Sequence, residues 1–298
     1  MMSNFKRTLG IVFSLFLLLG GFASCSKEEQ SKKDFVYNKG KLTILTDDAF
    51  KSVATAIAEA YAIRYPESEV KVEVKKEDLA FLDLLNHQSK LVIMSRQLSE
   101  KEIKEYERVV DLKFNPAHFA ADAVVFVVPK DSPKEFITEE EIKQALNSED
   151  KPLVFDGTNS GNLNFVAQKF NKKPTELKFS TISGNENVIK EISKYSGKIG
   201  VVSLNTISRP YGKEAMKLRE MVKVLPVKKD GKLIQPMAQN LIEFQYPFTR
   251  VLYFLSNEGN FGIANGVMRF ACTQIGQIVV EKEGLQPYYL FKREVEMR

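Results

Sequence analysis

The sequence has no tryptophan, and cysteine and histidine occur only twice each in its 298 residues. Two cysteines, Cys25 and Cys272, cannot build a disulfide framework, and Cys272 lies in an apolar segment where we expect a buried filler without a disulfide partner. The two histidines, His87 and His118, are far apart and lack the spacing of a metal site. These scarcities argue against a disulfide-rich or zinc-binding protein.

Catalytic motifs are missing as well. The sequence has no P-loop, no HExxH helix, no CxxC pair and no Ser–His–Asp order. Two isolated histidines leave few candidates for acid–base chemistry, and clustered carboxylates that hold a divalent ion for hydrolysis are the remaining enzymatic alternative. We expect a protein that is not an enzyme, with no catalytic residues, no cofactor and no metal.

Positive charge is modest and not concentrated in a dense basic stripe. The formal net charge is +5, and loss of residues 1–24, which contain Lys6 and Arg7 but no acids, leaves +3. This balance is not that of a nucleic-acid-binding protein. The hydrophobic fraction of 44% and charged fraction of 27% are ordinary for a globular protein, and the length suggests one large or two moderate domains.

The N-terminal residues have the pattern of a targeting signal. Lys6 and Arg7 precede the run "IVFSLFLLLGGFASC", which is too short and too one-sided for a stable membrane span, so residues 1–24 are predicted to be a secretory signal peptide. Ala23-Ser24-Cys25 resembles the lipobox of bacterial lipoproteins, although Phe22 replaces the usual leucine. We expect lipidation of Cys25 and attachment to a bacterial cell envelope, with a simple signal peptide and a chance cysteine as the alternative.

Residues 25–40 are charged and predicted to form a structureless tether. Residues 26–29, "SKEE", resemble an acidic signal that sends some bacterial lipoproteins to the cell surface. A short charged linker is the alternative, so both the periplasmic face and the cell surface remain open.

From residue 42 onward, strand patterns alternate with helix patterns, which predicts an α/β fold rich in parallel sheet. Ser99 is a candidate N-cap, and Thr138 with Glu141 has the spacing of a capping box. Residues 265–284 are predicted to form one long terminal helix.

Six segments in this order resemble the PstS-type phosphate-binding protein family of ABC transporters, over roughly residues 42–289. They are "LVIMSRQLSEKE", "DAVVFVVPKDSP", "GTNSGNLNF", "SGNENVIKEISKYSGKIGVVSLN", "YPFTRVLYFLSNE" and "GQIVVEKEGLQP". The resemblance implies a two-lobed periplasmic-binding-protein fold that closes on an oxyanion, with two crossing hinge strands near residues 124–129 and 246–255. Lobe 1 then comprises residues 41–128 and 246–298, and lobe 2 comprises residues 129–245.

The resemblance also implies a function, a ligand and partners. We expect an extracytoplasmic solute-binding lipoprotein, a monomer, that binds a small polar ligand, phosphate by family default, and serves a membrane permease. In the family, three loops present hydroxyls and backbone amides to phosphate. The matching candidate ligand residues here are Thr46, Asp47, Asp48, Asp78, Ser95, Arg96, Asp156, Ser160, Gly161 and Asn162.

This set is unusually acidic, because Asp156 stands where the family has arginine and Asn162 where it has threonine. Carboxylates repel a phosphate, and an N-capping Asp47 or Asp48 takes up amides that the ligand needs. We therefore predict weak or absent binding of free phosphate. The alternatives are a cation or a metal-bridged ligand, or a non-transport role in an envelope complex.

Overall fold

The computed structural model describes residues 36–291. The predicted signal peptide, Cys25 and the tether as far as residue 35 lie outside these residues. The last part of the predicted tether packs on the domain, because the Tyr37 ring lies 5.6 Å from that of Tyr65 and 5.3 Å from that of Phe261. Among the described residues, no helix combines the length and the apolar character needed to cross a membrane.

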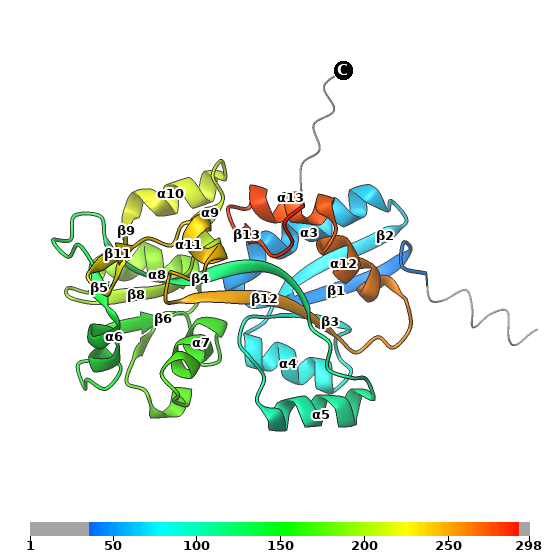
Figure 1. Ribbon diagram of the computed structural model, residues 1–298, viewed down its shortest axis with the longest axis horizontal. Helices are drawn as coiled ribbons and strands as arrows, with labels where there is room; N and C mark the ends of the chain where they lie inside the picture. Colours follow the sequence, from blue (N-terminus) through cyan, green and yellow to red (C-terminus); the bar gives the residue numbers. More distant parts are fainter. Residues whose placement is uncertain (1–35, 292–298) are drawn as a thin grey trace, which may run out of the picture. The chain divides into compact units, whose positions relative to one another are not determined.

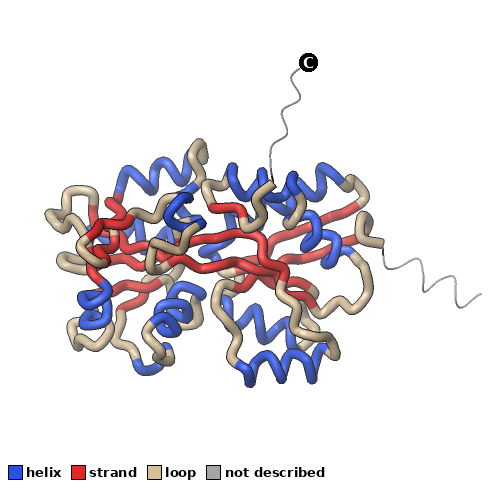
Figure 2. Tube along the Cα trace, in the orientation of Figure 1, coloured by secondary structure: helices blue, strands red, loops and turns tan. Residues whose placement is uncertain are grey.

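Most of the strands form one sheet, which runs through the middle of the view in Figure 2 with helices above and below it. Parallel pairing joins β1 to β2 and β3, and β6 to β7 and β8, whereas β12 and β4 are antiparallel to their neighbours. In order across the sheet, the strands are β2 (Ser68–Val74), β1 (Gly40–Thr46), β3 (Leu91–Met94), β12 (Thr249–Ser256), β4 (Ala117–Pro129), β8 (Ile199–Ser203), β6 (Leu153–Phe155) and β7 (Ser180–Thr181).

Short strands complete the β-structure. Two of them, β9 (Val222–Leu225) and β13 (Gln286–Pro287), pair with β4. A separate three-stranded sheet has the order β11 (Lys232–Ile234), β10 (Val227–Lys229), β5 (Ile137–Thr138).

Helices cover the sheet around both of its halves (Figure 1). The α-helices are α3 (Lys51–Arg64), α4 (Glu77–Leu85), α5 (Glu100–Val110), α6 (Glu139–Ala145), α7 (Gly161–Lys169), α8 (Asn185–Glu191), α9 (Asn205–Ser208), α10 (Lys213–Met221), α11 (Ala238–Ile242), α12 (Ile263–Ala271) and α13 (Gln274–Lys282). Residues 36–291 also contain the 3-10 helices η1 (Asp48–Phe50), η2 (Pro174–Glu176) and η3 (Ile192–Lys194).

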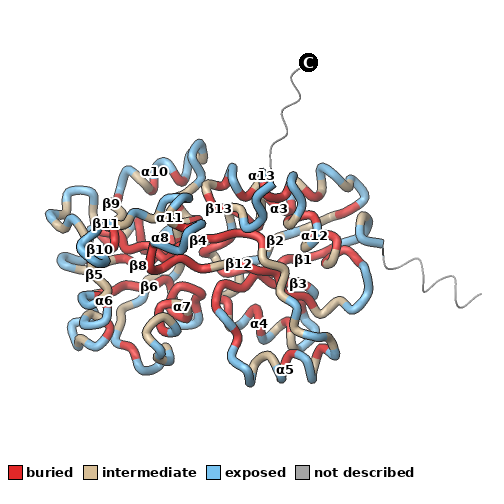
Figure 3. Tube along the Cα trace, viewed as in Figure 1, coloured by how far each residue is buried: buried red, intermediate tan, exposed pale blue. Residues whose placement is uncertain are grey.

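Separate hydrophobic cores divide the molecule into two lobes. In lobe 1, one core joins β1, β12, α3 and α12, and another joins β3, α4 and α5. In lobe 2, a single core joins β4, β6, β8, α7 and α8. The central strands of both lobes, such as β3, β4 and β12, are buried and the outer helix faces are exposed (Figure 3). The α/β two-lobed fold predicted from the sequence is confirmed, while the predicted boundaries at residues 128/129 and 245/246 stay predictions.

Strands β4 and β12 connect the lobes. They are antiparallel neighbours, with Thr249 opposite Ala123 and Arg250 opposite Asp122. Beyond Ala123, β4 continues into lobe 2, where Val124 to Val127 pair with β8. The two crossing strands implied near residues 124–129 and 246–255 are thus confirmed as β4 and β12, although β12 pairs with the part of β4 that precedes residue 124.

Two predicted helix starts are confirmed by cap geometry. The Ser99 side chain accepts a hydrogen bond from the Glu102 amide, and the Thr138 side chain accepts one from the Glu141 amide. In both cases the glutamate side chain accepts a hydrogen bond from the backbone amide of the cap residue. Each pair forms a capping box, which satisfies amides that lack a partner within the helix.

The predicted single helix over residues 265–284 is wrong, because the chain forms α12 and α13 with a break between them. Thr273 lies at the break in an extended conformation and accepts a hydrogen bond from the Gly276 amide as the N-cap of α13. Its hydroxyl also donates to the Phe270 carbonyl at 2.6 Å. A threonine hydroxyl can hydrogen-bond the nearby backbone in place of the regular helical hydrogen bonds. At Thr273 it does so, and the helix is interrupted.

Candidate ligand-binding site

Strand β1 ends at Thr46, and the chain turns directly into η1 and α3. Asp47 lies at this turn with extended backbone angles, and its Oδ1 accepts from the Ala49 amide at 3.1 Å. The Thr46 hydroxyl donates to the Asp47 carbonyl at 3.3 Å. Asp47 therefore has the N-capping role that the sequence suggested for one of the two aspartates.

The second carboxylate oxygen of Asp47 also accepts backbone hydrogen bonds. Oδ2 lies 3.2 Å from the amide nitrogen of Glu77 and 3.1 Å from that of Gly161. These amides open helices α4 and α7, and Gly161 belongs to lobe 2. Backbone amides at helix starts favour negative charge, so one carboxylate here fills a position well suited to an oxyanion.

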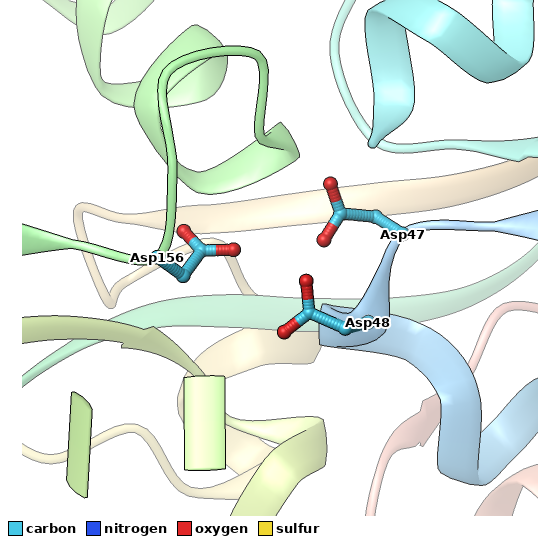
Figure 4. A group of neighbouring side chains, drawn as sticks. All are labelled: Asp47, Asp48 and Asp156. Atoms are coloured by element: carbon cyan, nitrogen blue, oxygen red, sulfur yellow. The ribbon is translucent and has the colours of Figure 1, made fainter. Parts of the chain in front are cut away.

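Asp48 and Asp156 lie beside Asp47, with their carboxylates directed toward one another (Figure 4). One carboxylate oxygen from each of the three side chains lies within 4.8 Å of the other two. Asp48 Oδ2 accepts from the Asn185 amide at 2.7 Å and from its Nδ2 at 2.8 Å, and Asp156 Oδ2 accepts from Nδ2 at 3.0 Å. Asp48 comes from lobe 1, whereas Asp156 and Asn185 come from lobe 2.

Lys76 supplies positive charge to this cluster. Its Nζ lies 2.8 Å from Asp156 Oδ2 and 3.6 Å from Asp47 Oδ1, and it also pairs with Asp48. The lysine stem runs past Gly157, where a Cβ would lie 3.0 Å from Lys76 Cε. Gly157 also has a φ of +145°, which favours glycine, so the turn after β6 has the shape that admits this side chain.

Burial and charge move the pKa values of these groups in different directions. Burial, with repulsion from Asp156, raises the pKa of Asp47 well above its usual range. Burial alone would raise the pKa of Asp48 too, but the Lys76 charge and hydrogen bonds from Lys76 and Asn185 lower it. For Lys76, burial opposes the charged form, yet the charges of Asp156, Asp47 and Asp48 prevail and raise its pKa.

Glu77 is a second buried acid next to the cluster. Its carboxylate accepts from Ser95 Oγ at 2.5 Å and from the Arg96 amide at 3.3 Å. Burial raises the pKa of this carboxyl. Gly161 lies against the same group, because a Cβ there would approach Glu77 and would lie 2.7 Å from Ser95 Oγ. Glycine at this position therefore lets the Glu77 and Ser95 side chains of lobe 1 approach the start of α7 closely.

Asp78 and Arg96 lie together but outside the three-aspartate cluster. Arg96 Nη2 lies 3.1 Å from Asp78 Oδ1 and 2.7 Å from Glu102 Oε1, so it pairs within lobe 1. Asn164 of lobe 2 donates to Asp78 Oδ1 at 2.9 Å. Arg96 is therefore engaged by acids of its own lobe.

The crossing strands add a fully buried ion pair. Arg250 Nη2 lies 2.7 Å from Asp122 Oδ2, and both side chains have no exposed surface. Asn162 accepts from Arg250 at 2.8 Å and donates to Asp156 at 3.0 Å. Asn162 thus links the buried pair to the aspartate cluster.

Most of the residues singled out from the sequence meet where the two lobes touch. Ser160 is the N-cap of α7, and its hydroxyl accepts from the Leu163 amide. Sequence reasoning missed five charged or polar residues of the site, three of them inside segments that carry the family resemblance. These residues are Lys76, Glu77, Asp122, Asn185 and Arg250.

Comparisons with known proteins agree with this architecture. A family model described as the PBP superfamily domain matches residues 36–274. The phosphate-binding protein PstS of Pseudomonas aeruginosa is 25% identical over 272 residues, which cover 83% of this chain and 83% of the relative.

Solved structures show the same fold. One is described as a phosphate ABC transporter substrate-binding protein with bound phosphate from Clostridium perfringens, with a TM-score of 0.67, 18% identity and coverage of 84% of this chain and 100% of that one. Another is an ABC-type phosphate transport receptor from Vibrio cholerae, with a TM-score of 0.61, 15% identity and coverage of 83% and 100%. Because the family model spans most of the sequence, the chain belongs to the PBP superfamily of two-lobed periplasmic-binding proteins.

Proposed function

We propose that this chain is the extracytoplasmic solute-binding component of an ABC transporter of the phosphate type. Its two lobes then close over a small polar ligand at the Asp47 cluster and present it to a membrane permease. Membership of the PBP superfamily supports this function, as does similarity to a relative named as a phosphate-binding protein.

The observation that carries the proposal is the convergence of backbone amides at one point between the lobes. The amides of Ala49, Glu77, Gly161 and Asn185 all donate to carboxylate oxygens of Asp47 or Asp48. Two of these amides come from lobe 1 and two from lobe 2. Such a set of donors suits a tetrahedral oxyanion, because each N–H can reach a different oxygen. A cavity of about 490 Å³ beside Asp48, lined also by Asn205 and Arg209, adjoins this point and offers a route to it.

Charge limits how tightly free phosphate can bind here. Three aspartates face one lysine, so the cluster is already short of positive charge. Two like charges about 4 Å apart repel by roughly 4 kcal/mol at an effective dielectric constant near 20. Phosphate therefore needs Asp47 to leave its amides, and we expect the wild-type affinity to be weak.

A cation at the three aspartates is less well supported. Oxygen ligands of this kind suit a divalent ion. However, Lys76 Nζ already lies among the three carboxylates and supplies the positive charge that an ion would bring. The cluster therefore favours neither a bound cation nor a metal-bridged ligand over the proposed function.

The proposal includes the arrangement of the whole chain. Residues 1–24 form the signal peptide, Cys25 carries the lipid and residues 25–40 link the lipid to the domain. Residues 129–245 form lobe 2, which the single core around β6 and β8 supports, and the flanking segments form lobe 1. The protein acts as a monomer and has no catalytic activity.

Titration calorimetry on the full-length chain, purified from the cell envelope, tests this function. The titrants are inorganic phosphate, sulfate and calcium, and the proteins are wild type, Asp47→Ser and the exposed control Asp131→Ser. We expect phosphate alone to bind, weakly in wild type and control and more tightly in Asp47→Ser. If phosphate binds to none of the three folded proteins, the proposed function is wrong.

A further inference from the structure

We propose that Asp47 and Lys76 act as an internal ligand, which occupies the oxyanion-binding amides and holds the two lobes closed without a solute. This inference rests on the proposed function, because it concerns the same site. It adds that the closed state of this chain does not require its ligand.

The first support is the number of amides that a single carboxylate satisfies. Asp47 accepts from the amides of Ala49, Glu77 and Gly161, at 3.1, 3.2 and 3.1 Å. Its side chain is completely buried, so water does not compete for these donors. A buried amide without an acceptor is costly, and closure without a solute requires that something accept from these groups. Asp47 does so for all three.

The second support is that three side chains from lobe 1 cross to lobe 2 at this point. Asp47 reaches the Gly161 amide, Asp48 reaches the Asn185 amide at 2.7 Å, and Lys76 reaches Asp156 at 2.8 Å. The crossing groups include both an anion and a cation. Each finds a complementary partner, which is how a bound ligand joins the lobes of a binding protein.

The third support is the shape of the turn between β6 and α7. At Gly157 and Gly161 the missing Cβ leaves room for side chains from lobe 1, Lys76 at the first glycine and Glu77 with Ser95 at the second. A Cβ at Gly157 would lie 3.0 Å from Lys76 Cε, and one at Gly161 would lie 2.7 Å from Ser95 Oγ. The turn of lobe 2 is therefore shaped around residues of lobe 1.

A solute must displace this internal ligand. The apparent affinity for a free oxyanion is reduced by the fraction of molecules in which Asp47 has left the amides. Removal of the Asp47 carboxylate should therefore have two effects. The lobes should separate in the absence of phosphate, and phosphate should bind more tightly.

The experiment measures closure and affinity separately in the full-length chain. Small-angle scattering and hydrogen exchange around Gly161 report closure in phosphate-free buffer and again with millimolar phosphate. Calorimetry gives the phosphate affinity. The variants are Asp47→Ser, which keeps a hydroxyl to cap η1, and Asp47→Asn, which keeps the size but places a donor near the amides. Asp131→Ser is the control, because Asp131 is exposed and lies in a turn away from the site.

We expect wild type and control to give the same scattering curve with and without phosphate, with slow exchange around Gly161. Both Asp47 variants should open and exchange at least about tenfold faster in phosphate-free buffer. Asp47→Ser should close again with phosphate and bind it at least about tenfold more tightly than wild type.

The outcomes separate this inference from the proposed function. If wild type is open without phosphate and closes when phosphate is added, the internal ligand is wrong and the solute-binding function stands. If the Asp47 variants open but no protein responds to phosphate, the internal ligand stands and the phosphate function is wrong. If both Asp47 variants remain as closed as wild type, Asp47 does not hold the lobes together and the inference is overturned.

Discussion

At the scale of single residues, Lys76 changes how the acidic site is understood. The sequence places Asp47, Asp48 and Asp156 where related binding proteins have hydroxyls, amides or an arginine, which predicts a cleft with excess negative charge. In the structure, Lys76 pairs with all three carboxylates. The excess is therefore smaller than the aspartates alone imply, because Lys76 offsets part of their negative charge.

Asp48 makes the site sensitive to acid. Burial alone would raise its pKa, but Lys76 and Asn185 lower it below the usual range. A carboxyl whose folded pKa is lowered contributes stability above its unfolded pKa, about 4, and this stability is lost as the pH falls through the folded pKa. We expect the free energy of unfolding to decrease below about pH 4, and Asp48→Asn to make this decrease shallower. Urea unfolding at a series of pH values measures it.

Two neighbouring acids, Asp47 and Glu77, change the stability with pH in the opposite direction, so their effect must be separated from that of Asp48. Burial raises the pKa values of Asp47 and Glu77, so both lower the stability as the pH rises above their unfolded values. The comparison is therefore between wild type and Asp48→Asn over one pH range, with the exposed Asp131→Asn as control. Equal slopes for wild type and Asp48→Asn below pH 4 would contradict the prediction.

At the scale of elements, β4 and β12 carry both the connection between the lobes and its central ion pair. Arg250 on β12 lies directly opposite Asp122 on β4, and the guanidinium lies 4.6 Å from the centre of the Phe50 ring. Asp122 also accepts from Ser203 of lobe 2 at 2.9 Å. The two strands therefore join the lobes through side chains as well as through the backbone ladder.

Breaking this pair should be strongly destabilising. Arg250→Met leaves Asp122 buried without its cation, and loss of one partner of a buried pair typically costs about 3–5 kcal/mol of unfolding free energy. Denaturant unfolding measures the loss. The matched control is Arg108→Met, which removes an exposed pair with Glu105 and should change stability little. Adding Asp122→Ala to Arg250→Met should recover part of the loss, and a single variant as stable as wild type would refute this role.

At the scale of the whole molecule, the folded domain is expected to be attached to a membrane by its N-terminus. The tether predicted over residues 25–40 shortens in the structure, because Tyr37 packs on lobe 1 and β1 begins at Gly40. In the proposed lipid-anchored protein, the residues between Cys25 and Tyr37 would set the distance between lipid and domain. At most about 3.5 Å per residue is available to that segment.

Lipidation at Cys25 is tested with the other cysteine as control. In cells fed a labelled fatty acid, we expect label in wild type and in Cys272→Ala, but not in Cys25→Ala. The Cys25→Ala protein should also leave the membrane fraction. Label in Cys25→Ala at the wild-type level would rule out this anchor and leave the simple signal peptide as the explanation.

The sequence by itself determined the class of fold and the alternation of strands and helices over much of the chain. Local patterns were sufficient for this, since apolar runs marked β3, β4 and β12. The N-cap candidate Ser99 and the capping-box spacing of Thr138 and Glu141 marked two helix starts. The terminal helix was the exception. Its residues suit one continuous helix, and the break at Thr273 depends on a hydroxyl that bonds the Phe270 carbonyl instead.

The partners of each candidate site residue were decided only by the tertiary structure. Lys76 and Asp156 are 80 residues apart, and Asp47 and Gly161 are 114 apart, so no local pattern relates them. Contacts between the two lobes bring these groups together, and Asp47 and Asp156 are fully buried there. Asp47, which the sequence suggested only as a helix cap, also accepts hydrogen bonds from the amides at the starts of two other helices. Burial leaves those amides no other acceptor.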